Sequence, residues 1–147
     1  MKKVFDMQIR QPEDFLIKGT RKGDLLLSRI GDGTFRGQNI QGRVLPLGMS
    51  TTYTPSVGVN LIHAPLLLET DDGARLFMQL DAYLHLAQEL EEKLLAGESV
   101  PPDQYYYKGT ASFDIGHSRY KWLEDRLFVC QGIINSWSAL EFAVYEM

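Results

Sequence analysis

Residues Leu66–Leu80, with the sequence LLLETDDGARLFMQL, contain the clearest structural signal in the chain. Two apolar-rich runs flank an Asp-Asp-Gly turn, which is a strong short-range indication of a β-hairpin. Asp72 and Gly73 suit a tight turn because glycine adopts positive φ freely and aspartate tolerates it better than most residues do. We therefore predict two antiparallel strands joined at this turn.

The composition sets limits on the class of protein. The chain has 147 residues, which predicts one domain covering 1–147, and 44% of them are hydrophobic, enough to build a core without disulfides or metals. The formal net charge is −4 and lysine and arginine do not cluster, so we expect no nucleic-acid partner. Cys130 is the only cysteine, which excludes an intramolecular disulfide framework. Without a signal peptide or a long apolar run, we expect a soluble, cytoplasmic protein with no membrane partner.

Alternation of apolar and polar residues predicts that most of the chain is strand. In Val4–Arg10, Phe5, Met7 and Ile9 point to one side, as in a half-buried strand. Pro65 has no backbone donor, so its strand should start near an edge or carry a bulge. The other predicted strands are Leu25–Leu27, Phe35–Pro46, Tyr53–Asn60, Leu61–Thr70, Tyr105–Ile115, Arg126–Ile134 and Ala139–Glu146.

One segment has the period of a helix. Between Tyr83 and Ala96, apolar residues recur at i, i+3, i+4, i+7 and i+11, opposite a charged face. Asp81 can cap its start and Gly97 can end it in the left-handed conformation. About eight to ten short strands and one helix predict a compact, mainly β structure, an antiparallel β-barrel with the helix packed on it. A β-sandwich is the competing architecture.

Several segments, taken in order, resemble one protein family. They are LETDDGARLF, LLAGESVPPDQYYYKG, Phe113-Asp114 and RYKWLEDRLFV at residues 119–129, and the similarity extends from the first strand to the closing VYEM. This pattern resembles the domain-of-unknown-function 3237 family, also called uncharacterised protein family 0311. The resemblance implies a compact, roughly calycin-like β-barrel from bacteria or fungi with no settled activity.

The chain departs from the family pattern at polar positions. Where a Gly-Gly-x-Asp-Trp element is typical, the sequence reads LGMSTTY at residues 47–53, and Leu80 replaces the asparagine that usually follows the hairpin. Lys108 and Glu124 also stand at altered positions, in the elements that correspond to YYFR and WLN. The resemblance therefore identifies a divergent member, whose ligand can differ from that of its relatives.

Familiar catalytic and metal-binding patterns are absent from the sequence. His63, His85 and His117 are widely separated and match no ligand spacing, so we expect no metal and no cofactor. We expect His63 to be an interior group, His85 to be exposed, and Asp71 and Asp72 to make the turn. Cys130 lies among apolar residues, where a cysteine usually serves packing.

The aromatic residues favour a small-molecule site. Rings with polar tips suit an apolar pocket that needs a few oriented hydrogen bonds, and a barrel of about eight strands can hold one small ligand. The alternative is a cofactor-independent acid–base enzyme, such as an isomerase, cyclase or lyase, using His63, Asp81, Tyr107 or Glu124. A homo-oligomer formed through the helix or an edge strand is a third possibility. An interior filled by leucine, methionine and phenylalanine would count against both the binding and the catalytic hypothesis. The candidate ligand-binding residues are Tyr53, His63, Phe77, Gln79, Tyr107 and Trp122.

Overall fold

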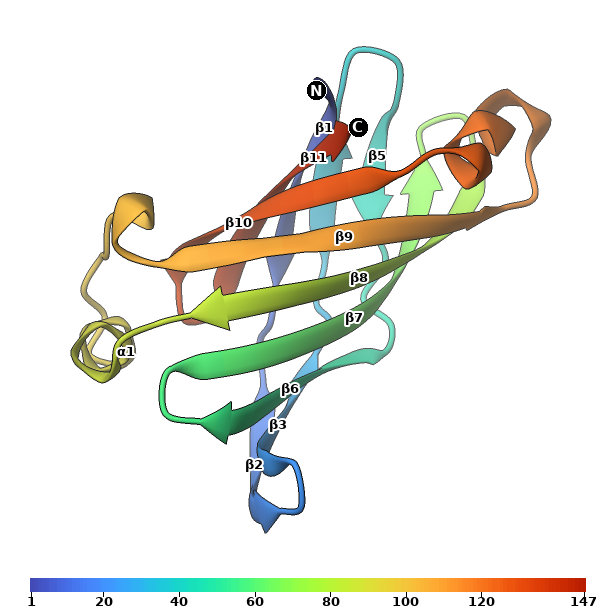
Figure 1. The fold of residues 1–147 in the computed structure, drawn as a ribbon. Helices are drawn as coiled ribbons and strands as arrows, with labels where there is room; N and C mark the ends of the chain where they lie inside the picture. The colour runs from blue at the N-terminus through green and yellow to red at the C-terminus, as the bar shows by residue number, and fades with distance from the viewer.

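The computed structural model describes residues 1–147 and consists mainly of antiparallel strands (Figure 1). Eleven strands, one α-helix and two short 3-10 helices follow one another along the chain. The strands are β1 (Lys2–Arg10), β2 (Asp14–Thr20), β3 (Gly23–Arg29), β4 (Gly33–Arg36), β5 (Gln41–Val44), β6 (Met49–Ser56), β7 (Val59–Thr70), β8 (Arg75–His85), β9 (Tyr106–Ile115), β10 (Phe128–Ser136) and β11 (Ala139–Glu146). The helices are α1 (Gln88–Leu95), η1 (Pro102–Gln104) and η2 (Ser118–Asp125).

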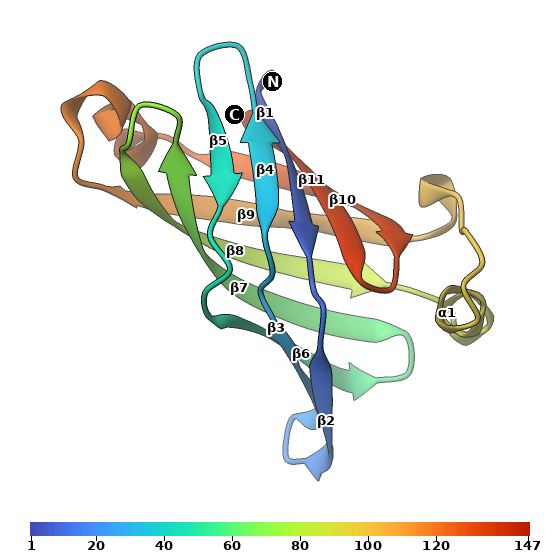
Figure 2. The same cartoon turned by 180° about the vertical axis from the view of Figure 1, so that it is seen from behind.

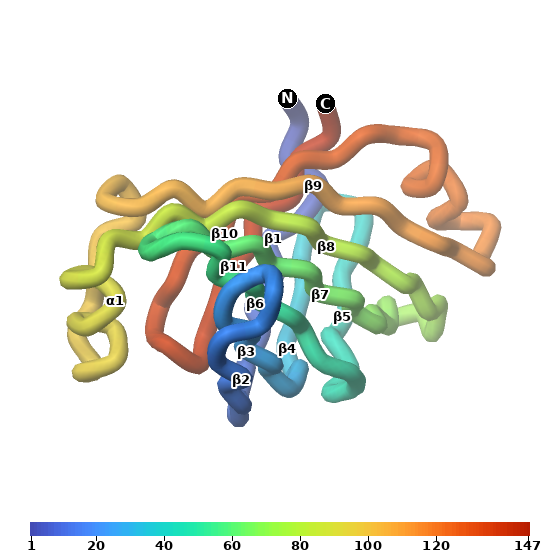
Figure 3. Tube along the Cα trace, turned by 60° about the horizontal axis from the view of Figure 1, so that its bottom comes forward, coloured from blue at the N-terminus to red at the C-terminus, as the bar shows by residue number.

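Eight of the strands close into a barrel, which confirms the predicted fold class. Their order is β7-β5-β4-β1-β11-β10-β9-β8, and β8 pairs again with β7 to complete the circle. Strands β6, β3 and β2 continue the sheet outward from β7, so β2 forms its free edge. Figures 1 and 2 show the β2–β3 hairpin projecting away from the barrel. Lys2 pairs with Glu146, and the two chain ends accordingly lie side by side (Figure 3).

Strand β7 serves two neighbours on one of its sides. Its first half pairs with β6 as far as His63, and its last residues pair with β5 from Leu68 onward. Pro65 lies between these two pairings, where neither β6 nor β5 has a residue in register. Pro65 was predicted near an edge, and it lies instead at a gap in the pairing on one side of a long strand. At this gap the missing backbone N–H of proline costs no ladder hydrogen bond.

The predicted hairpin is present and its turn is closed by backbone hydrogen bonds. Gly73 donates to the Thr70 carbonyl at 3.0 Å, and Thr70 donates to Ala74 at 2.8 Å. Gly73 has φ of 88°, in the left-handed region that favours glycine. Beyond the turn, β7 and β8 stay in register from Glu69↔Arg75 to Val59↔His85.

The helix is shorter than the sequence pattern predicts. It begins at Gln88, because residues up to His85 belong to β8 and pair on both sides, with β7 and with β9. Asp81 is consequently a strand residue and does not cap the helix. Gly97 has φ of 86° and follows the helix end as predicted. The helix packs against the barrel end through Leu94, which is buried, and Leu90, which is partly buried.

Three other strand predictions need correction. The predicted strand Tyr53–Asn60 crosses the turn between β6, which ends at Ser56, and β7, which begins at Val59. The predicted strand Phe35–Pro46 is split into β4 and β5, which pair with each other across the turn that separates them. Strand β2 was not predicted, because nearly all its side chains are exposed and the alternation that marks a half-buried strand is missing. No helix of the structure has the length and apolar character needed to cross a bilayer.

Large apolar side chains fill the barrel interior. The inward residues of β7 and β8 alternate with outward ones, and Leu66, Met78 and Leu80 have no exposed surface. Aromatic rings complete the packing, with Phe5 and Phe35 at 5.4 Å between centroids and Phe113 and Phe128 at 5.1 Å. The interior is thus a leucine-, methionine- and phenylalanine-rich core, which counts against a ligand inside it.

Tyr107 belongs to this core and depends on a glycine opposite. Its ring lies edge-on to Phe142, with centroids 5.2 Å apart. A Cβ atom at Gly132 would come within 2.6 Å of the ring carbon Cγ of Tyr107. The absence of a side chain at Gly132 therefore makes room for the tyrosine ring.

We predict that Gly132→Ala lowers the free energy of unfolding by about 1–3 kcal/mol, since it overpacks a filled core. Urea denaturation followed by tryptophan fluorescence measures the change. Gly116→Ala is the matched control, because a Cβ there meets nothing within 4 Å and its φ is not positive. Equal stabilities of the two variants would contradict the packing role of Gly132.

Candidate ligand groove on the outer face

The register of the sheet sets a row of short side chains across the outside of the barrel. Thr51 pairs with His63, His63 with Asp81, Asp81 with Thr110, and Thr110 with Val129. Directly paired residues point to the same face of a sheet. All five residues are at least partly exposed, whereas their chain neighbours Ile62 and Ala82 are buried.

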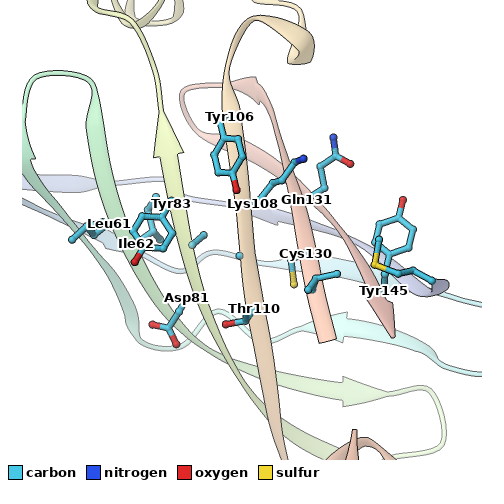
Figure 4. A pocket seen from close by; sticks show the side chains of 14 residues that line it. Leu61, Ile62, Asp81, Tyr83, Tyr106, Lys108, Thr110, Cys130, Gln131 and Tyr145 are labelled. Atoms are coloured by element: carbon cyan, nitrogen blue, oxygen red, sulfur yellow. The ribbon is translucent and has the colours of Figure 1, made fainter. Parts of the chain in front are cut away.

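A groove of about 990 Å³ lies on this outer face (Figure 4). Asp81, Thr110 and Val129 contribute its short side chains, while long side chains from β7 to β11 and from the N-terminal residue surround them. Because the short side chains lie between longer ones, a hollow remains above the strands. The long side chains that line it are Met1, Leu61, Tyr83, Tyr106, Lys108, Gln131 and Tyr145.

The groove combines apolar walls with a few polar groups. Nine of its fourteen lining residues are hydrophobic. Figure 4 shows the Asp81 carboxylate and the Thr110 hydroxyl on adjacent strands. The Lys108 ammonium lies 5.3 Å from the centroid of the Tyr106 ring, so a positive charge stands beside an aromatic wall. Mainly apolar walls with few oriented polar groups are typical of small-molecule sites.

Asp81 connects the groove to His63. The Nδ1 atom of His63 lies 2.8 Å from Oδ1 of Asp81. Because an ionised carboxylate only accepts hydrogen bonds, this geometry assigns the neutral-ring proton to Nδ1 and leaves Nε2 as the free lone pair. The side chains are 44% and 65% exposed respectively, so solvent reaches both. The prediction that His63 is an interior group is wrong, since the interior positions beside it belong to Ile62 and Ala64.

The six predicted ligand-binding residues lie in different parts of the molecule. Phe77 and Gln79 point outward from β8, beyond the groove. Tyr107 is in the core, and Trp122 on η2 lies between the Phe128 ring and the Arg126 guanidinium, 5.4 Å from the latter. Tyr53 on β6 lies beneath the ammonium of Lys22. Two of the six pair directly with residues that line the groove, Tyr53 with Leu61 and His63 with Asp81.

The other titratable candidates have structural partners. Glu124 accepts a hydrogen bond from the Ile115 backbone at 3.1 Å, and the ammonium of Lys121 lies 2.9 Å from its other oxygen. The Lys121 hydrogen bond is the main reason why the pKa of Glu124 is lowered, so this carboxyl is a poor proton donor. Burial raises the pKa of Cys130 to about 12, which keeps its thiol protonated and unreactive. His85 is exposed, as predicted, and lies against the Tyr106 ring.

The sequence contained one usable signal for the groove. Alternation along the second hairpin strand places Phe77, Gln79 and Asp81 on one mixed face, which is the outward face of β8. Tyr83 continues the same alternation, but the helical pattern that starts there concealed it. Thr110, Lys108 and Tyr145 could not be found from sequence, because their proximity to Asp81 depends on the pairing of β8 to β11.

The comparisons with known proteins agree with this fold. The family model described as Protein of unknown function (DUF3237) matches residues 1–147. The chain belongs to the DUF3237 family. A UPF0311 protein of Clostridium acetobutylicum is 29% identical over 128 residues, covering 86% of this chain and 81% of that protein. The crystal structure of a conserved protein of unknown function from Rhodopseudomonas palustris superposes with a TM-score of 0.91 at 27% identity, covering 99% of this chain and 95% of that one.

A more distant structural neighbour is described as an enzyme from Penicillium herquei. It has a TM-score of 0.69 at 16% identity and covers 98% of this chain and 92% of that one. At this identity the likeness concerns the fold alone.

Two departures from the DUF3237 pattern fall at buried positions. Leu80, which replaces the usual asparagine, is completely buried inside the barrel. Ser50, in the segment that lacks the Asp-Trp pair, is buried on β6, next to the barrel, and accepts a hydrogen bond from the Gln11 amide at 3.1 Å. An asparagine at position 80 would need hydrogen-bond partners, whereas leucine needs only contact. In this family member, residue 80 therefore contributes apolar packing to the core and no polar group.

The hairpin carboxylates, Asp71 and Asp72, lie in the turn as predicted, and Asp72 also binds residues of the adjacent η2 segment. Asp72 accepts hydrogen bonds from Thr70, from the Tyr120 hydroxyl at 2.9 Å and from the Arg119 guanidinium at 2.8 Å. These donors, with Thr70 contributing most, lower the pKa of Asp72 from its ordinary 3.8 to about 2. Asp71 accepts from the Gln41 amide at 2.9 Å. Neither carboxylate lies in the groove.

We predict that the stability advantage of the wild type over Asp72→Asn depends on pH. The folded pKa lies below the unfolded one, so the contribution of Asp72 is present above pH 3.8 and is lost as the pH falls through about 2. The difference in free energy of unfolding between the two proteins should narrow over that interval. Urea denaturation at several pH values measures it, with Asp71→Asn as the control for a charge change in the same turn. A difference that stays constant across the interval would contradict this role.

Proposed function

We propose that the protein binds a small hydroxylated aromatic molecule in the outer groove. The groove itself carries this proposal, because it joins an apolar, tyrosine-rich wall to a carboxylate and an ammonium within one hollow of about 990 Å³. Ligand sites in proteins commonly have volumes of roughly 300–1,000 Å³. The filled core directs the proposal to the outside of the barrel.

The polar groups specify where a ligand hydroxyl would bind. Oδ1 of Asp81 already faces His63, which leaves Oδ2 able to accept a hydrogen bond from a ligand. Figure 4 shows the rings of Tyr83 and Tyr106 on the same side of Asp81, on adjacent strands, where they offer aromatic faces and edges to a flat molecule. Lys108 adds attraction for a partly ionised phenol. A neutral or weakly acidic phenol or naphthol fits this set of groups.

We predict that Thr110→Phe weakens binding of 2-naphthol by at least about tenfold, or ~1.4 kcal/mol. The new ring fills the floor of the groove, and Thr110 is exposed, so the fold is retained. Titration followed by amide chemical shifts measures the dissociation constant and places the bound probe. Ser112→Phe is the matched control, since residue 112 is the next outward position on β9 and does not line the groove.

Either of two results would overturn the binding proposal. One is equal affinity of the two phenylalanine variants for 2-naphthol. The other is an absence of thermal stabilisation across a library of hydroxylated aromatic and polyketide-like compounds, because a ligand of the native state must raise its apparent stability.

The His63–Asp81 pair supports acid–base catalysis as a second candidate function. A carboxylate that accepts from Nδ1 orients the imidazole and stabilises its protonated form, while Nε2 takes a proton from a substrate. The distance of 2.8 Å meets the geometric requirement for such a pair. The enzyme from Penicillium herquei, which shares this fold, is compatible with catalysis on it. The reaction would be a cofactor-independent proton transfer, as in an isomerisation, cyclisation or elimination.

We predict that the protein accelerates exchange of the α-protons of 2-tetralone with deuterated solvent, and that His63→Gln lowers this rate by about 10²-fold or more, the usual contribution of a general base. Proton NMR in deuterium oxide measures the exchange. His117→Gln is the control, because it removes an exposed imidazole that does not line the groove and leaves the His63–Asp81 pair intact. Equal rates for the two histidine variants would contradict a catalytic role while leaving 2-naphthol binding to be judged separately.

A further inference from the structure

Strand β2 is the free edge of the sheet, and its exposed side chains are unusually apolar. Phe15, Leu16 and Ile17 are 64%, 54% and 48% exposed. The strand pairs with β3 on one side and has no partner on the other. Proteins usually protect such edges with charges, prolines or bulges, since an exposed edge is a template for pairing with another chain. In β2 the register shifts between Ile17 and Thr20, so the regular stretch open to pairing is residues 14–18. We propose that two copies of the chain associate through this edge, β2 pairing antiparallel with β2 of the second copy.

The direction of the backbone groups supports this pairing. The Arg29 N–H donates to the Glu13 carbonyl at 2.9 Å, so residue 13 turns its backbone acceptor toward β3. Backbone groups alternate in direction along a strand. Residues 15 and 17 therefore also face β3, and Asp14, Leu16 and Lys18 direct their N–H and C=O groups to the free edge.

The sequence of β2 is complementary to itself when one copy is reversed. With Leu16 opposite Leu16 of the second copy, Asp14 faces Lys18 and Phe15 faces Ile17. Within its own chain, Oδ2 of Asp14 accepts a hydrogen bond from the Trp137 indole at 3.0 Å, and Oδ1 is the oxygen that would meet Lys18 of the second copy. Asp14, Leu16 and Lys18 then each meet a residue of the second copy whose backbone N–H and C=O groups also point to the free edge. This is the arrangement that a ladder of exchanged backbone hydrogen bonds requires. A register shifted by two residues would place Asp14 or Lys18 against Leu16. The charges thus select one antiparallel register with twofold symmetry.

The same pairing covers apolar surface on both faces of the strand. Phe15 and Ile17 share the outer face with Leu27 and Leu25, to which they are directly paired. On the opposite face, Leu16 meets its counterpart between the two Asp14–Lys18 pairs. The hairpin projects from the barrel in Figures 1 and 2, so a second copy can approach this edge. A second copy of the chain is therefore the occupant that fits both the backbone and the side chains.

A charge-exchange experiment tests the partner and the register together. Sedimentation velocity should show that the wild type is a dimer, and that Lys18→Glu and Asp14→Lys each dissociate at least about tenfold more readily because like charges then face each other. Mixing the two variants should restore the dimer. The unchanged Asp14 of one variant then faces the unchanged Lys18 of the other, and the introduced glutamate faces the introduced lysine, so both pairs have opposite charges. Arg21→Glu is the control, because it makes the same charge change as Lys18→Glu in the hairpin turn, outside β2.

Hydrogen exchange provides a second measurement that does not depend on the strength of the ion pairs. In the dimer, the amides of Asp14, Leu16 and Lys18 should be protected, and in the Lys18→Glu monomer they should exchange rapidly while Phe15 and Ile17 remain protected by β3. A monomeric wild type, or a dimer that leaves these three amides unprotected, would overturn the proposal. A dimer that Lys18→Glu, Asp14→Lys and their mixture form equally well would overturn the register.

Discussion

The pairing of β7 with β8 is the interaction on which the rest of the structure depends. It closes the barrel, since β8 is the last strand of an order that begins at β7. It also determines which side chains enter the core and which face outward, because a slip of one residue would exchange the two sets. Leu66, Met78 and Leu80 are interior and His63 and Asp81 are exterior for this one reason. The tight turn at Gly73 holds that register.

The parts of the fold that the sequence predicts are those with local causes. The hairpin depends on turn residues and alternation, the end of the helix depends on Gly97, and the first strand depends on Phe5, Met7 and Ile9 facing one side. The helix start was misplaced because Tyr83 satisfies a helical and a strand pattern at once. Two ladders of backbone hydrogen bonds, to β7 and to β9, decide in favour of the strand. Pairing between distant segments is not visible in a single sequence.

The same limit explains what could be predicted of the candidate site. His63 and Asp81 were both singled out as titratable groups, but their contact joins residues eighteen positions apart across a ladder. Tyr107 and Phe77 have the aromatic character expected of a ligand site, yet the first packs against Phe142 and the second lies beyond the groove. Composition indicates that aromatic side chains are available. The register decides which of them share a surface.

The gap at Pro65 divides the molecule into parts that are held together with different strength. The barrel strands share a common core, whereas β6, β3 and β2 are joined to it mainly through the short ladder from Thr51↔His63 to Ser56↔Val59. A segment with few buried apolar contacts opens at a lower free energy than the global unfolding reaction. We therefore expect these three strands to open at a lower free energy than the closed barrel. Because Thr51 pairs with His63, such an opening would change the solvent exposure of the His63–Asp81 pair.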